Sequence, residues 1–305
     1  MPAAANARTM ARPKPLAPPV TNATLPASSC MLCARVRLRA VSEKPVTQTT
    51  GRRKVRACVA SRQGYDESHH GRRIGTMLAM TIAGLLFLLT HLGVSSTPLR
   101  AVLVRRLGEG GYLGAYSLVA AVTLGLMIWM YANLPRLPYL WLPSPTLYLV
   151  PKVIMGLAFV LIGGSFLARN PSAVGMAGTL DAPDAPTRLA YGVNRITRHP
   201  LQWGIALWAG SHLVANGDAV SVVFFAAFLL LALLGSALID SKKAARLGAP
   251  WQAFAAVTSN VPFAAIVRGR NRLVLRELVG PLVAGALLYA AAFYGHAYIA
   301  GVPLA

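Results

Sequence analysis

Residues 194–218 (NRITRHPLQWGIALWAGSHLVANGD) place two histidines at and within an apolar stretch. An Arg-His-Pro step opens the stretch, His212 lies inside it, and Asn-Gly-Asp closes it. Ionisable side chains in a membrane-spanning segment are costly, and they mark functional sites by default. Imidazole can ligate haem or another metal without any thiolate. The stretch therefore predicts an intramembrane histidine site, and the alternative is that its histidines only cross-link helices through hydrogen bonds.

Four histidines belong to the apolar part of the chain: His91, His199, His212 and His296. His199 and His212 are about 20 Å apart along an ideal helix, so they cannot ligate one iron from opposite sides. His212 shares a polar stripe with Gln202 and Asn216 at helical spacing. If successive apolar segments cross the membrane in alternate directions, His91 lies at a depth closer to that of His199, and His212 lies closer to that of His296.

Six apolar segments must position these side chains. Because the runs are continuous rather than alternating, they predict an all-α, multi-pass transmembrane bundle of about six helices. The fourth is short for a span, so we expect it to include part of the preceding loop. The segments cover 77–96, 112–132, 150–168, 201–216, 219–239 and 278–300.

The connections carry most of the charge. Asn216-Gly217-Asp218 predicts a tight helical hairpin, with Gly217 left-handed at the helix end and Asp218 capping the next helix. The basic loops 97–111, 169–200 and 240–277 are expected on one side, facing stroma or cytoplasm. The stretch 170–191 within the second loop reads as irregular, either a lid or an idle surface loop.

Composition supports a membrane protein and argues against a nucleic-acid partner. Only 13% of the 305 residues are charged, against about 25% in soluble domains. The formal net charge is +21, but the positive residues lie in the N-terminal part and between apolar runs. Loop charges of this kind set membrane orientation.

Residues 1–75 predict a disordered N-terminal leader, distinct from the membrane domain at 76–305. They are rich in Arg, Ala, Ser, Thr and Pro and poor in acids, which is typical of an organelle transit peptide. Processing after Ala57 is the expected cleavage, and a disordered cytosolic tail is the alternative. All three cysteines, Cys30, Cys33 and Cys58, lie in this leader, so the membrane domain has no disulfide and no thiolate ligand.

A second chemistry is open to the Arg-His-Pro step. With Asp240 and the later Val261-Pro262, it resembles the frame of isoprenylcysteine-type and phospholipid methyltransferases. Ser241 stands where that frame has a second carboxylate, which weakens the assignment.

Two longer segments resemble the NnrU family of multi-pass membrane proteins. They are THLGVSSTPLRAVLVRRLGEGGYLGAYSLV (90–119) and TRHPLQWGIALWAGSHLVANGD (197–218), and the resemblance extends over nearly all of 77–300. The family has a bacterial branch associated with nitrogen-oxide metabolism. Its plastid branch comprises the 15-cis-zeta-carotene isomerases. The leader favours the plastid branch and a chloroplast membrane location.

The resemblance implies a haem b enzyme that converts the central 15-cis double bond of tri-cis zeta-carotene to trans. It carries the axial-ligand role to His91 and His212, with His199 as substitute ligand or supporting residue. Gln202 and Asn216 are the further cofactor-contacting candidates. The implied partners are a C40 carotene, membrane lipid and other carotenoid-pathway enzymes. The alternatives are a non-catalytic haem or metal protein, an Arg-His-Pro methyltransferase and a structural membrane protein.

Overall fold

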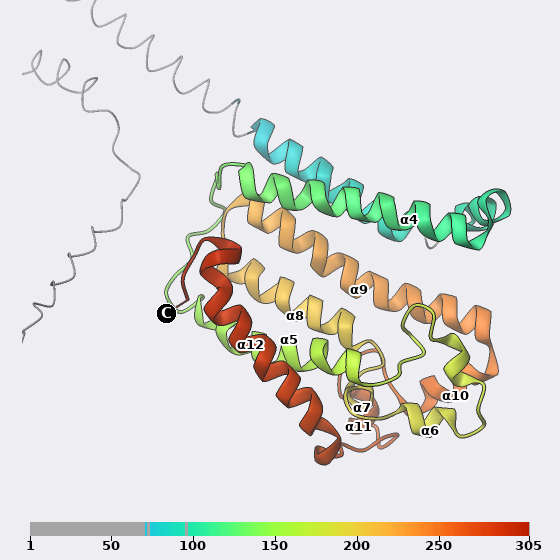
Figure 1. Ribbon diagram of the computed structural model, residues 1–305. Helices are drawn as coiled ribbons and strands as arrows, with labels where there is room; N and C mark the ends of the chain where they lie inside the picture. Colours follow the sequence, from blue (N-terminus) through green and yellow to red (C-terminus); the bar gives the residue numbers. More distant parts are fainter. Residues whose placement is uncertain (1–70, 72–73, 95–96, 305) are drawn as a thin grey trace, which may run out of the picture. The chain divides into compact units, whose positions relative to one another are not determined.

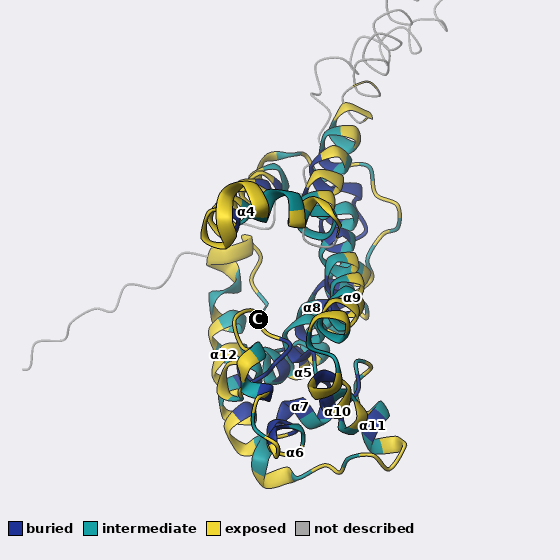
Figure 2. Ribbon diagram, turned by 90° about the vertical axis from the view of Figure 1, so that its right-hand side faces the viewer, coloured by how far each residue is buried: buried dark blue, intermediate teal, exposed yellow. Residues whose placement is uncertain are grey.

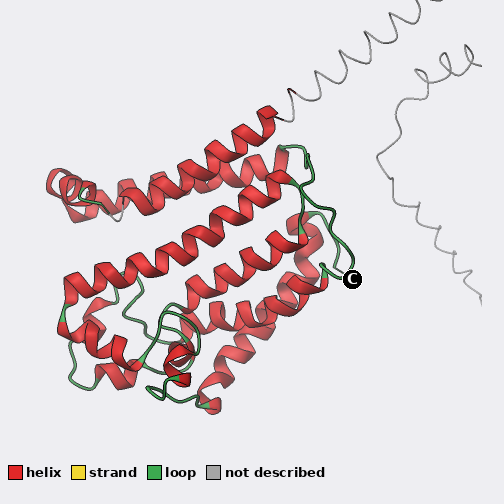
Figure 3. Ribbon diagram, turned by 180° about the vertical axis from the view of Figure 1, so that it is seen from behind, coloured by secondary structure: helices red, strands yellow, loops and turns green. Residues whose placement is uncertain are grey.

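The computed structural model describes residues 71, 74–94 and 97–304, so most of the predicted leader, with its three cysteines, lies outside this range, and its last residues, Ile74 and Gly75, are helical. Within it the chain is helical without a β-strand, apart from one bridge between Tyr139 and Asp218 (Figure 3). This confirms the all-α prediction. The principal helices are Ile74–Gly93, α4 (Leu99–Asn133), α5 (Leu149–Leu167), α8 (Pro200–Ala215), α9 (Ala219–Leu247) and α12 (Val279–Ala300).

Short helices fill the connections on one side of the bundle. They are η3 (Ala177–Leu180), α6 (Ala185–Leu189), α7 (Val193–Ile196), α10 (Ala249–Val257), α11 (Ala264–Val267) and η4 (Leu275–Leu278). The prediction of an irregular stretch at 170–191 missed two of them. Leu180 and Leu189 are buried there against Trp251 and Phe254 of α10, so this stretch is packed rather than idle.

Five helices of the described residues are long and apolar enough to cross a membrane. They are Ile74–Gly93, α4, α5, α9 and the continuous stretch Leu275–Ala300. The sixth apolar segment forms α8, which begins at Pro200 after a non-helical His199 with φ −122°. The expectation that α8 extends back into the loop is therefore wrong, because His199 leaves helical geometry there.

The predicted loop at 97–111 is also wrong. Residues from Leu99 onward are helical, and α4 is interrupted only at Gly108, whose φ of 72° and ψ of 167° break the helix. The charged run Arg105-Arg106 misled the prediction, because arginine is in fact a good helix former. Gly108 allows the first turns of α4 to leave the axis of its long apolar part.

Helix packing follows a simple order. α5 packs between α12 and α8, and α8 packs in turn against α9 (Figure 1). Small residues permit these close approaches: a Cβ on Gly285 would lie 2.8 Å from the Val160 backbone, and one on Gly204 would lie 3.0 Å from the Ala158 carbonyl oxygen. Without a hydrophobic driving force between helices in lipid, such close backbone contact is a main source of association.

The helix Ile74–Gly93 and α4 are held to α9 by a buried apolar cluster. Met80, Phe87, Met127 and Phe224 are members of this cluster, and each is at most 6% exposed. The outward faces are apolar but exposed, as Figure 2 shows for α4 and α12. Large exposed apolar side chains are normal where the solvent is lipid.

The α8–α9 hairpin is confirmed, with one difference. The Asp218 carboxylate accepts a hydrogen bond from the Ser221 backbone N–H at 2.9 Å and caps α9. Gly217 is not left-handed, contrary to expectation. It is required for another reason: a Cβ at this position would collide with the Trp141 carbonyl oxygen.

Candidate functional site

His91 lies in a π-helical turn, η2 (Leu89–Gly93), at the end of the first spanning helix. Its Nδ1 is 2.8 Å from the Phe87 carbonyl oxygen, and its ring centroid is 4.2 Å from that of Phe87. The Tyr116 hydroxyl of α4 donates to the His91 carbonyl oxygen at 3.1 Å. π-helical turns are rare and often mark functional positions, and this one widens the backbone at the histidine itself.

His212 is held in a very similar way in the last turn of α8. Its Nδ1 is 2.8 Å from the Trp208 carbonyl oxygen, four residues back along the helix. Its ring packs against Phe225 of α9, with centroids 5.2 Å apart. A carbonyl partner on Nδ1 fixes the imidazole tautomer so that Nε2 carries the lone pair, which is the usual arrangement of a metal-binding histidine.

A series of aromatic rings connects the two histidines. Phe87, beside His91, lies 5.1 Å from Phe228, and Phe228 lies 5.2 Å from Trp208, which precedes His212 by one turn. All these rings belong to the bundle interior or its partly buried lining. These three rings, called the aromatic layer below, lie between the two histidines.

Contacts with α4 show how deep in the bundle each histidine lies. Thr90, next to His91, has its hydroxyl oxygen 3.5 Å from that of Thr123. His212 packs on Phe225, which contacts Tyr131 with ring centroids 5.8 Å apart. Thr123 and Tyr131 are separated by about 12 Å along an α-helix. His91 and His212 therefore lie at different depths.

This separation limits how a haem could be held. Each imidazole has the orientation of a metal ligand, so the donor chemistry fits haem iron one histidine at a time. The pair does not fit a single iron ligated by both, because axial nitrogens must lie about 2 Å from the metal on opposite sides. The described residues contain no group of three or more His, Cys, Asp or Glu side chains that could hold a metal ion by themselves.

The remaining predicted site residues have assignable positions. Asn216 donates its side-chain N–H to the His212 carbonyl oxygen at 2.8 Å, so it supports the histidine through the end of the helix. Gln202 lies in the first turn of α8, far from His212. His296 has its Nδ1 2.6 Å from the Val302 carbonyl oxygen, near the end of α12.

His199 belongs to a different cluster, at the basic end of the bundle. It is fully buried, and its Nε2 is 2.7 Å from Asp240 Oδ1. Arg198 donates two hydrogen bonds to the same carboxylate, at 2.8 Å from Nε and 2.6 Å from Nη2. Asn260 donates a fourth hydrogen bond to Asp240 at 3.2 Å. Asp240 is thus the centre of a polar cluster, which the positions of the histidines in the sequence do not predict by themselves.

Two further observations define this cluster. Nδ1 of His199 has no hydrogen-bond partner, and it is the one such buried side-chain atom in the described range. Asn170 extends the cluster by donating to the Arg198 carbonyl oxygen and to the Asn194 side chain, each at 3.0 Å. Ser241, in contrast, is exposed and donates to the Ala237 carbonyl oxygen, away from the cluster. The sequence pattern shared with methyltransferases includes Asp240. Asn170 and Asn260, in contrast, belong to no sequence motif, so the sequence alone does not single them out.

Comparison with known proteins places the chain in a family. Residues 79–304 match the family described as NnrU protein. The 15-cis-zeta-carotene isomerase, chloroplastic, of Zea mays is 32% identical over 109 residues, which are 34% of this chain and 30% of that protein. The protein of the same description from Arabidopsis thaliana is 32% identical over 114 residues, 36% of this chain and 31% of that protein.

The matches to these two relatives span about a third of their length. No solved structure matches the chain. The family match covers the histidines, the aromatic layer and the polar cluster together. This chain belongs to the NnrU family of membrane proteins.

Proposed function

We propose that this protein is a cis–trans isomerase of a lipophilic polyene, with 15-cis-zeta-carotene as its substrate. The observation that carries the proposal is the similarity to two plant 15-cis-zeta-carotene isomerases. A C40 hydrocarbon partitions into the bilayer, so its enzyme must act from an apolar, membrane-embedded surface. The substrate would lie beside the aromatic layer between His91 and His212, where the Trp208 and Phe228 rings are only partly buried.

Haem b is the cofactor we propose, with His91 and His212 each as an iron ligand at its own position rather than as one pair on a single iron. Bound haem would supply an iron centre able to weaken the double-bond character of the polyene. The chain would hold each imidazole by its carbonyl-bonded Nδ1 and exclude water with the surrounding rings. His199 would act only at the polar cluster. The proposed location is a plastid membrane, where other carotenoid-pathway enzymes are candidate partners.

The reaction is tested in a carotenogenic bacterium engineered to accumulate tri-cis zeta-carotene. Dark-grown cells that express the chain should accumulate the 15-trans product, as read by chromatography. His91→Ala and His212→Ala should each reduce this product about tenfold or more if they ligate the cofactor. His296→Ala, on the outer helix α12, is the matched control and should retain activity. Unchanged isomers with well-expressed wild-type protein would contradict the proposed reaction.

The cofactor is tested separately by visible spectroscopy of the purified chain. A Soret band that shifts on reduction is expected, and it should weaken in the His91→Ala and His212→Ala proteins. A folded but colourless preparation would contradict haem. A Soret band without any isomerised carotene would instead favour a non-catalytic haem protein.

One observation favours a second candidate function. The Arg198, His199 and Asp240 side chains are assembled into one cluster, as the methyltransferase frame requires. Ser241 lies outside that cluster, so the second acidic position of the frame is not supplied. Equilibrium dialysis with S-adenosylmethionine tests this candidate. Loss of binding in an Asp240→Asn protein that circular dichroism shows to be folded would support a methyltransferase, whereas no binding by the folded wild type would exclude this candidate.

A further inference from the structure

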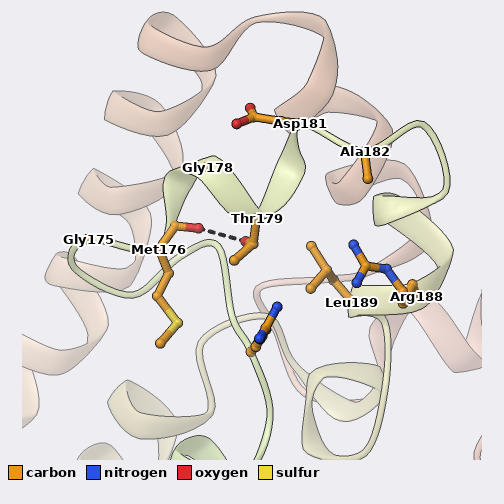
Figure 4. Close-up of a pocket in the computed structure, with 9 residues that line it drawn as sticks. Gly175, Met176, Gly178, Thr179, Asp181, Ala182, Arg188 and Leu189 are labelled. Atoms are coloured by element: carbon orange, nitrogen blue, oxygen red, sulfur yellow. Dashed lines mark hydrogen bonds between the residues drawn. The ribbon is translucent and has the colours of Figure 1, made fainter.

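A cavity of about 480 Å³ opens in the segment that joins α5 to α7 (Figure 4). This volume is too large for a single ion and falls in the range of small-molecule sites. Its lining includes Arg169, Met176, Thr179, Asp181, Arg188 and Leu189. None of these residues takes part in the histidine sites.

The cavity has a fixed frame. Asn194, which is fully buried, donates its two side-chain N–H groups to the carbonyl oxygens of Arg169 and Leu189, each at 3.0 Å. These bonds tie together the two ends of the segment that surrounds the cavity. Leu180 and Leu189 anchor the same segment in the buried cluster with α10. The backbone that borders the cavity is therefore held in place by these contacts.

The charge of the lining is positive. Arg169 and Arg188 contribute guanidinium groups, and Asp181 is the one carboxylate of the lining. Figure 4 shows the Asp181 carboxylate turned away from Arg188. Arg188 pairs at 3.5 Å with Asp184, but both side chains are exposed, so this pair is weak. Within the described ranges Arg169 has no carboxylate at ion-pair distance.

Guanidinium groups bind phosphate well, because their planar, paired N–H groups donate hydrogen bonds to two phosphate oxygens at once. The cavity also has an apolar wall, since Met176 and Leu189 line it. A phosphate joined to a small organic group would satisfy both parts of the lining.

The position of the cavity favours a lipid as the source of that phosphate. Arg169 follows the membrane-spanning helix α5 by two residues. Phe166 and Leu167, in the last turn of α5, are 76% and 58% exposed, and in a bilayer these apolar side chains would face lipid acyl chains. A lipid beside these two side chains would carry its headgroup to the depth of Arg169. The basic loops lie at this same end of the bundle, and basic segments beside a membrane attract anionic lipid headgroups.

We infer that this cavity binds the phosphate headgroup of an anionic phospholipid. Arg169 and Arg188 hold the phosphate, the apolar wall contacts the glycerol, and the acyl chains lie along the end of α5. The inference is independent of the proposed isomerase activity, because it shares no residue with the aromatic layer.

Binding is measured with the full chain purified in detergent and titrated with short-chain phosphatidylglycerol. The Arg169→Gln/Arg188→Gln protein should bind the lipid about tenfold more weakly or worse. The matched control is Arg268→Gln/Arg272→Gln, which removes the same charge from exposed arginines of the 258–277 connection. The control should bind within about twofold of the wild type, because isolated surface charges contribute little.

A third variant separates shape from charge. Arg169→Lys/Arg188→Lys keeps both positive charges but loses the paired donors, so it should bind distinctly more weakly than wild type. Equal weakening by the glutamine pair and the control would overturn the site, as would wild-type binding in the lysine variant. Displacement of the lipid by equimolar inorganic phosphate would identify a soluble anion as the ligand and overturn the lipid assignment. Failure of the wild-type protein to bind phosphatidylglycerol would also overturn the proposed site.

Discussion

At the scale of single residues, Asp240 is the side chain on which most of the polar cluster depends. It accepts hydrogen bonds from Arg198, His199 and Asn260, and its side chain is only 20% exposed. Arg198 is 13% exposed, so removing the carboxylate leaves a partly buried guanidinium without its counter-charge. Uncompensated buried charges are among the most destabilising changes in proteins.

Asp240→Asn should therefore destabilise the folded protein by about 3 kcal/mol or more. Thermal unfolding in detergent, followed by circular dichroism, measures the loss. Ser241→Ala is the neighbouring control, and it should unfold like wild type because Ser241 is exposed and bonds only within its own helix. If the two variants unfold at the same temperature, the cluster does not stabilise the fold.

The residue scale also shows what the sequence could and could not predict about the site. The histidines stand out in the sequence because ionisable groups are rare in apolar runs, and the family resemblance selects His91 and His212 among them. The methyltransferase-like frame links Asp240 to the Arg-His-Pro step, but the hydrogen bonds between Arg198 and Asp240 join two segments that meet only after folding. The unpartnered Nδ1 of His199 is likewise a property of the packed cluster. The different depths of His91 and His212 could be predicted from the sequence. Each lies near the C-terminal end of its helix, and the two helices run in opposite directions.

At the scale of elements, the contact of α5 with α12 is made through glycine. A Cβ on Gly285 would lie 2.7 Å from a Val160 side-chain atom and 2.8 Å from its backbone, which cannot move without shifting α5. Gly285→Ala should therefore destabilise the protein by about 1–3 kcal/mol, as overpacking does. Urea or thermal unfolding of the purified variant measures this cost.

Gly295→Ala on the same helix is the control for that prediction. A Cβ there meets only Ile299 Cδ1 at 3.7 Å, an ordinary van der Waals distance. Because alanine favours helix more than glycine does, this variant should be neutral or slightly stabilised. A Gly285→Ala protein as stable as Gly295→Ala would show that α5 and α12 are not in close backbone contact.

Element boundaries were predictable where apolar runs were continuous, and less so where charge interrupted them. The six segments are all helical because lipid leaves the backbone no other way to satisfy its hydrogen bonds. The early start of α4 was missed because Arg105 and Arg106 read as a loop, although their backbone is helical. The short helices η3 and α6 were missed because they depend on packing against α10 rather than on local periodicity.

At the scale of the whole molecule, contacts assign the loops to two ends of the membrane domain. Arg198 pairs with Asp240 and Arg195 pairs with Glu277, so the 169–200 and 240–277 connections meet at one end. Lys242 lies near enough to Arg100 for their charges to interact, which brings the start of α4 to that end. Tyr139 bridges to Asp218 at the other end. The basic residues are thus concentrated at one end of the described domain.

Positive loops remain on the side from which a membrane protein is inserted, so this end should face the cytoplasm when the chain is expressed in bacteria. The prediction can be tested by cysteine labelling after Cys30, Cys33 and Cys58 are replaced by serine. Val174→Cys and Val267→Cys, at positions 93% and 84% exposed, should react with an impermeant maleimide only in inside-out vesicles. Leu142→Cys, at a position 80% exposed at the other end, should react only in right-side-out vesicles. In this topology the single crossing by α5 separates positions 142 and 174. Labelling of Val174→Cys and Leu142→Cys from the same side would therefore contradict it.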